Sequence, residues 1–193
     1  MANNYLYFDP EITKRTLIAL LGKPPYEQHI NTINDYSMYL IIAYYEYYFN
    51  TGDIEFIKIY YDRIAALYDF ICSRLDESGY VCKREGDWIF IDWADLDKSG
   101  PLAAEQILLW RTHLAMASLS ELVGRADGIY ERRAARLKRS IMKDFWREER
   151  GAFIDTYVSG RENVTRHASV FAVMYDFVSK KRAKKIERCV FKN

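Results

Sequence analysis

The chain has 193 residues, half of them apolar, which is enough for one domain with a sizeable hydrophobic core. Its 28 basic and 27 acidic residues give a formal net charge of +1, so no overall field attracts it to nucleic acid or to a membrane surface. The longest apolar runs are too short to span a bilayer, and the N-terminus lacks a basic start followed by an apolar stretch. We therefore expect a soluble, cytoplasmic protein with no nucleic-acid and no membrane partner.

The first half of the chain predicts three helices. Asp9-Pro10 is a cap followed by proline, and apolar residues then recur at helical spacing until Gly22. Asn34 or Asp35 caps a second helix that runs through Asn50 and is apolar on all faces, a pattern typical of a buried helix. The Thr51-Gly52-Asp53 turn closes it and caps a third helix over residues 54–75.

The second half predicts more helices with short extended pieces between them. Residues 80–82 and 88–91 are β-prone, and residues 151–155 form another extended stretch. Helices are expected after Pro101 up to Gly124 and then over three further ranges, 129–146, 165–178 and 183–189. The sequence thus predicts one all-α domain over residues 1–193. Its hairpins of roughly 40 to 50 residues suggest a helical array or toroid with short β insertions.

One stretch departs from the helical pattern. Residues 86–101 place four aspartates among aromatic residues: Asp87, Asp92, Asp95 and Asp97 flank Trp88, Phe90 and Trp93. Aromatic faces cover the C–H surface of a pyranose, while carboxylates accept hydrogen bonds from its hydroxyls or move protons. The stretch is therefore our candidate sugar site.

Each of these features also has a simpler interpretation. Aspartates are common in turns because they bond nearby backbone, and Asp95 and Asp97 are best explained as caps. Six tyrosines lie in the second helix, and aromatic residues at helical spacing usually pack in a core, so only Tyr36, at the helix start, is expected in a site. Glu105 either faces a cavity or favours the dipole of its helix from the first turn.

The sequence predicts no metal site and no cofactor. His29, His113 and His167 are scattered, and the three cysteines have no metal-type spacing. The basic run that begins at Lys180 lacks interleaved aromatic residues, so we interpret it as a solvated helix face.

A set of motifs carries a resemblance to a known family. The stretches Gly22-Lys23-Pro24-Pro25-Tyr26-Glu27-Gln28-His29-Ile30-Asn31, Asp35-Tyr36-Ser37, Thr51-Gly52-Asp53, Gly86-Asp87-Trp88 through Asp92-Trp93, and Val164-Thr165-Arg166-His167-Ala168 resemble, in order, the catalytic domain of bacterial α-L-rhamnosidases. The resemblance implies six helical hairpins closed into an (α/α)6 toroid, and inverting hydrolysis of terminal α-L-rhamnosides. A rhamnose-containing glycan is then the expected ligand.

The resemblance also implies site residues. An aromatic residue matching Tyr36 and the tryptophan matching Trp88 line the rhamnose pocket in the family. We add four residues to the predicted substrate-binding set because they lie near these two in sequence: Asp35, Asp87, Asp92 and Trp93. No catalytic residue is assigned, because the family's general acid motif lies upstream of this sequence, its general base lies downstream, and neither motif occurs here.

A complete toroid needs about 300 residues, given ordinary helix and loop lengths. We therefore expect a partial toroid, incomplete at both ends and inactive alone. The alternative is a non-catalytic helical binding or assembly module that forms homo-oligomers through exposed hairpin faces. A glucuronyl hydrolase, a third possibility, fits the fold but not the Pro-Pro-Tyr-Glu-Gln-His stretch.

Overall fold

The computed structural model describes residues 9–191, so residues 1–5, on which the expected absence of a leader depends, lie outside it. The described residues form seven α-helices: α2 (Pro10–Leu21), α3 (Asn34–Thr51), α4 (Ile54–Ser73), α5 (Ala103–Leu122), α6 (Ile129–Asp144), α7 (Arg166–Met174) and α8 (Lys180–Ile186). The all-α prediction is confirmed. Among these residues, no helix has the length and apolar character needed to cross a membrane.

Short elements complete the chain. The 3-10 helix η1 (Ile30–Thr32) precedes α3, and the π-helix η2 (Glu187–Phe191) follows α8. Strands β1 (Trp146–Arg147) and β2 (Ala152–Phe153) pair antiparallel, which gives the predicted extended stretch before α7 a two-stranded form. The earlier β-prone pieces make only isolated bridges, Leu75 with Val81 and Ile33 with Trp88.

Two helices form the centre of the molecule. Helix α3 lies against α2, α4 and α5, and helix α5 lies in turn against α4, α6 and α7. Both are buried around most of their circumference, as the lack of a polar face in their sequences requires. Helices α4 and α6 pack one apolar face on this centre, and α6 carries its basic residues on the outside. Helices α3 and α5 therefore form an inner layer, and helices α4 and α6 form an outer layer.

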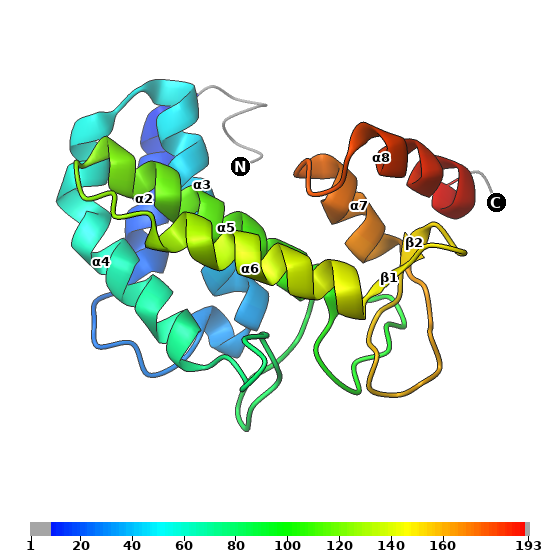
Figure 1. Ribbon diagram of the computed structural model, residues 1–193. Helices are drawn as coiled ribbons and strands as arrows, with labels where there is room; N and C mark the ends of the chain where they lie inside the picture. Colours follow the sequence, from blue (N-terminus) through cyan, green and yellow to red (C-terminus); the bar gives the residue numbers. More distant parts are fainter. Residues whose placement is uncertain (1–8, 192–193) are drawn as a thin grey trace.

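The connections differ at the two ends of the central helices. Short turns follow α3 and α5, whereas the chain enters α3, α5 and α7 through long segments, residues 22–33, 74–102 and 145–165 (Figure 1). These three segments gather at the lower edge of the view, next to the N-terminal ends of α3, α5 and α7. Any site built from loops therefore lies at this end of the hairpins.

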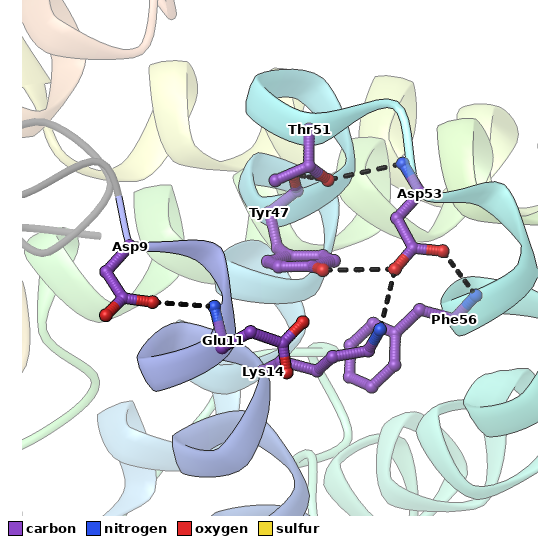
Figure 2. A network of polar contacts seen from close by, with 7 residues as sticks. All are labelled: Asp9, Glu11, Lys14, Tyr47, Thr51, Asp53 and Phe56. Carbon is purple, nitrogen blue, oxygen red and sulfur yellow. Dashed lines mark hydrogen bonds and ion pairs between the residues drawn. The ribbon is translucent and has the colours of Figure 1, made fainter.

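The opposite end of α3 is closed by the Thr-Gly-Asp turn. Gly52 adopts a left-handed conformation (φ 70°) and its N–H donates to the Tyr48 carbonyl. The Asp53 side chain then caps α4 by accepting from Phe56 N (3.0 Å), and it also accepts from Lys14 Nζ (2.9 Å) and the Tyr47 hydroxyl (3.1 Å) (Figure 2). One carboxylate thus joins α2, α3 and α4.

Several helix ends differ from the sequence prediction. Helix α3 begins after Ile33 and no side chain caps it, so the prediction of an Asn34 or Asp35 cap is wrong: both side chains are buried instead. Helix α6 ends at Asp144, because the next residues turn into the β1–β2 hairpin. Helix α8 begins earlier than predicted, because the Ser179 hydroxyl caps it through Arg182 N.

Candidate functional site

The segment that carries the Gly-Asp-Trp motif lies across the start of α3. Trp88 N donates to the Thr32 carbonyl (2.8 Å), and Asn34 N donates to the Trp88 carbonyl (3.2 Å). The second of these bonds gives the first N–H of the uncapped helix α3 a partner. The two bonds together fix the backbone of Trp88 beside Tyr36, which lies in the first turn of that helix.

Four aromatic residues form a continuous surface here, which we call the aromatic surface: Tyr36, Trp88, Phe90 and Trp93. Phe90 lies at its centre, with ring centroids 6.5 Å from Tyr36, 5.3 Å from Trp88 and 5.2 Å from Trp93. The side chains of Tyr36, Trp88 and Trp93 remain 37%, 44% and 82% exposed. Exposed aromatic faces of this kind suit the C–H face of a sugar ring.

Asp87 faces inward rather than toward the aromatic surface. Asp87 is 8% exposed, and its Oδ2 accepts a hydrogen bond from Arg74 Nη2 at 2.6 Å. The Arg74 guanidinium also lies over the Phe70 ring, 5.5 Å from its centroid. Asp87 therefore anchors the segment to the end of α4, and Trp88 comes directly after it in sequence.

A buried polar cluster lies where the first turns of α3 and α5 approach each other. It consists of Asn34, Asp35 and Glu105, none more than 1% exposed. Burial holds the pKa of Glu105 well above its usual range, and the nearby Asp35 raises it further. Burial likewise raises the pKa of Asp35, while the backbone N–H groups of Phe90 and Ile91 oppose the rise.

The carboxyl oxygens of Glu105 and the Oδ1 atoms of Asn34 and Asp35 have no close hydrogen-bond partner among the described residues. A glutamate in this setting is held as the neutral acid, which is the form that low polarity favours. Glu105 does lie in the first turn of α5, as one of the two sequence explanations expected, but its side chain is fully buried rather than in solvent.

Asp92 and Trp93 lie farther along the same segment. Asp92 Oδ2 is 3.0 Å from His167 Nε2, and this bond lowers the pKa of Asp92. Its Oδ1 accepts from Trp93 N at 2.6 Å. Because His167 belongs to the first turn of α7, the pair connects the aromatic surface to the N-terminal end of that helix.

Asp97 has the structural role that the sequence favoured. Its Oδ1 accepts from Ser99 N and Oγ, and its Oδ2 accepts from the Ser159 hydroxyl. These hydroxyl contacts lower the pKa of Asp97. The carboxylate therefore holds residues 97–99 against residues 155–159.

Comparisons with known proteins agree with this arrangement. The family model of the bacterial alpha-L-rhamnosidase 6 hairpin glycosidase domain matches residues 19–193. The chain belongs to this family. No curated protein matches it.

Two solved structures share the fold of this six-hairpin domain. A rhamnosidase from Klebsiella oxytoca, solved with rhamnose bound, is 21% identical with a TM-score of 0.78 over 99% of this chain. A GH78 family rhamnosidase of Bacillus sp. GL1 is 22% identical with a TM-score of 0.81 over 96% of this chain. The chain spans 39% of the first structure's length and 21% of the second's.

The six-hairpin domain brings together part of the predicted site. Tyr36, Trp88 and Trp93 share the aromatic surface, Asp92 borders it, and Asp35 and Asp87 lie behind it as buried supports. The sequence analysis did not include Phe90 in the site, although its alternation with Trp88 was a signal that both side chains face the same way. It also missed Arg74, for which no local sequence signal exists.

Apart from His167, which is bonded to Asp92, the histidines of the chain are structural. His29 and His113 are buried, and burial lowers the pKa of His29 to about 4 and that of His113 to about 3. They bond the hydroxyls of Ser37 and Tyr68, respectively. Within residues 9–191 no group of three His, Cys, Asp or Glu side chains is arranged to hold a metal ion.

Proposed function

We propose that this chain provides the sugar-binding face of a glycoside hydrolase domain that acts on terminal α-L-rhamnosides. The observation that carries the proposal is the aromatic surface, at the end of the hairpins where the long segments gather, in a member of the rhamnosidase six-hairpin family. Rhamnose bound in the Klebsiella oxytoca structure supports a sugar as the ligand. Trp88 and Tyr36 would stack on the ring, and Asp92 would accept bonds from its hydroxyls.

Asp35 and Asp87 take a different part in this proposal. Both are buried, and Asp87 already accepts the Arg74 bond. They would act on the sugar indirectly, by holding the segment that carries Trp88 against α3 and α4. Hydroxyl recognition by their own oxygens would require the segment to open.

Titration of L-rhamnose against intrinsic tryptophan fluorescence tests the proposal. Trp88→Ala should weaken the binding several-fold, because stacking on an aromatic ring is worth roughly 1 kcal/mol. Phe49→Ala is the matched control, since Phe49 is also an exposed aromatic residue of α3 but lies at the opposite end. L-fucose, a 6-deoxysugar of different configuration, should bind more weakly. Equal binding by both variants would contradict the proposal.

We further propose that the chain alone does not hydrolyse rhamnosides. Inversion needs an acid and a base on opposite faces of the glycosidic bond, with carboxyls about 6.5 to 9.5 Å apart. Near the aromatic surface, Asp35 and Glu105 are buried, Asp87 is bonded to Arg74, and Asp92 is bonded to His167. Turnover of an aryl α-L-rhamnoside that Asp92→Asn abolishes would overturn this view.

A second candidate function is assembly with another copy of the chain. It is favoured by an apolar groove of about 360 Å³ between α2, η1 and α3, whose lining includes Leu17, Leu20, Tyr39, Leu40 and Ala43. Sedimentation velocity over a range of concentrations tests it. A compact monomer at the highest concentration would contradict it.

A further inference from the structure

A second cavity lies within the segment that carries the aromatic surface. Its volume is about 510 Å³, and it opens between two limbs of the connection from α4 to α5, residues 82–85 and 98–100. Three of the seven lining residues are cationic and one is acidic. The lining consists of Cys82, Lys83, Arg84, Glu85, Lys98, Ser99 and Gly100.

None of the three cations forms an ion pair within 4.0 Å in the described part of the chain, although Lys98 lies near enough to Asp35 and Asp92 to favour their charged forms. Lys98 Nζ donates to the carbonyls of Ile89 (3.0 Å) and Phe90 (3.3 Å), and Arg84 donates to the Leu75 carbonyl (3.1 Å). Carbonyl oxygens orient these cations but carry no full charge. By contrast, Arg74 and Arg147 at the same end of the hairpins each contact a carboxylate.

The cavity has a fixed wall. Ser99 is bonded to Asp97, and Gly100 lies so close to the next segment that a Cβ would approach Val158 Cγ2 to 2.4 Å. Only glycine permits this approach. The limb that carries Lys98 is therefore held in place before any ligand binds, and preorganised charges lose less entropy on binding.

The cavity also adjoins the aromatic surface. The two carbonyls that hold the Lys98 amine belong to Ile89 and Phe90, the residues directly after Trp88. The Lys98 amine thus lies against the backbone of Phe90, whose ring is at the centre of the aromatic surface.

We propose that this cavity binds an anionic group, a carboxylate or a sulfate, on the sugar unit linked to the one that contacts the aromatic surface. The inference rests on the proposed function and extends it to the glycan class: the chain recognises rhamnose attached to an acidic sugar. Lys83 and Arg84 contact the anion from one limb of the cavity, and Lys98 from the fixed wall. Glu85 opposes anion binding, but three cations against one carboxylate leave the lining with a net charge of +2.

The experiment compares two disaccharides that differ only in a carboxylate, α-L-rhamnosyl-(1→4)-D-glucuronate and α-L-rhamnosyl-(1→4)-D-glucose, by calorimetric titration of the full chain. The acidic disaccharide should bind about ten-fold more tightly at low salt, since each exposed charge contact contributes roughly two- to five-fold. The preference should shrink between about 50 mM and about 500 mM NaCl because exposed charges are screened.

The double variant Lys83→Gln/Arg84→Gln should remove most of the preference and leave affinity for the neutral disaccharide unchanged. Lys98 is kept, because it also supports the loop carbonyls. The charge-matched control is Lys180→Gln/Lys181→Gln on α8, which should keep the full preference. A preference retained in the first variant would overturn the inference.

The remaining outcomes separate this inference from the function on which it rests. Equal binding of the two disaccharides, both weakened by Trp88→Ala, would overturn the acidic-glycan inference alone. Failure of both disaccharides to bind would overturn the sugar-binding proposal as well. Binding of inorganic sulfate that depends on Lys83 and Arg84, without any preference between the disaccharides, would identify a simple anion site and also overturn the inference.

Discussion

Two turns at opposite ends of α3 use the same residue types differently. At the Thr-Gly-Asp turn, Asp53 accepts from a backbone N–H, a lysine and a tyrosine, and all three donors belong to the hairpins themselves (Figure 2). At the Gly-Asp-Trp segment, Asp87 is bonded to Arg74, but the residues after it expose two tryptophans, Trp88 and Trp93. They also cover the Glu105 carboxyl, whose two oxygens lack a close partner.

An aspartate in a family motif therefore does not by itself mark a ligand contact, because both aspartates hold the scaffold. The two turns differ in the structure that comes next along the chain: helix α4 after Asp53, and an exposed aromatic stretch after Asp87. Incomplete polar pairing and exposed apolar surface are features that proteins keep mainly where they serve function. Variants at the two turns test this distinction, and they are taken in decreasing order of their effect on stability.

The largest effect concerns pH and the buried acid beneath the Gly-Asp-Trp segment. Burial raises the pKa of Glu105, so the folded protein keeps a proton that the unfolded chain releases above about pH 4.3. The free energy of unfolding should therefore fall as pH rises from there toward the raised pKa, by up to about 1.4 kcal/mol per pH unit. Glu105→Gln should remove this contribution.

Urea unfolding of the wild type and Glu105→Gln between about pH 5 and about pH 8 measures that difference. The variant should gain stability relative to the wild type as pH rises. His29 and His113 give the opposite slope at lower pH, because their lowered pKa values mean that the unfolded chain binds protons first as pH falls below about 6.5. Parallel curves for the two proteins would contradict the assignment of Glu105 as a neutral acid.

The second prediction concerns the anchor of the segment. Arg74→Ala leaves the Asp87 carboxylate buried without its cation and should lower the free energy of unfolding by about 2 to 3 kcal/mol, less than for a fully buried pair because Arg74 is partly exposed. Lys58→Ala, which removes an exposed ion pair with Glu55, should change it by less than about 0.5 kcal/mol. Similar unfolding midpoints for the two variants would count against the anchoring role.

Sequence reasoning recovered the helices because their signals are local. Pro10, Gly22 and Gly52 stand where the chain starts or stops a helix, and these boundaries agree with the structure within a residue or two. The prediction that Asn34 or Asp35 caps α3 was wrong because both side chains are buried in a polar cluster. That cluster includes Glu105, which is far away in sequence. Likewise, no local pattern pairs Asp87 with Arg74 across the turn between them.

The third prediction weakens the other turn. Asp53→Ala removes the α4 cap and the bonds from Tyr47 and Lys14, and should lower the free energy of unfolding by about 1 to 2 kcal/mol without changing rhamnose affinity. Asp53→Asn should recover part of this loss, since an amide oxygen still caps. The Lys14 bond lowers the pKa of Asp53, so its contribution is present above the usual carboxyl range and disappears as pH falls through the lowered value. Reduced rhamnose affinity in Asp53→Ala would break the division between the two ends.

The smallest effect on stability is expected at the most exposed residue of the aromatic surface. Trp93 is 82% exposed, so Trp93→Ala should change the free energy of unfolding by no more than about 0.5 kcal/mol. Its ring nevertheless contacts Phe90 at 5.2 Å and Trp88 at 6.2 Å, so a sugar on these rings would also touch Trp93. The variant should therefore bind L-rhamnose roughly two- to five-fold more weakly, while unfolding at the same urea concentration. A residue that only packs would show the reverse, a shifted midpoint with unchanged affinity, and that result would remove Trp93 from the site.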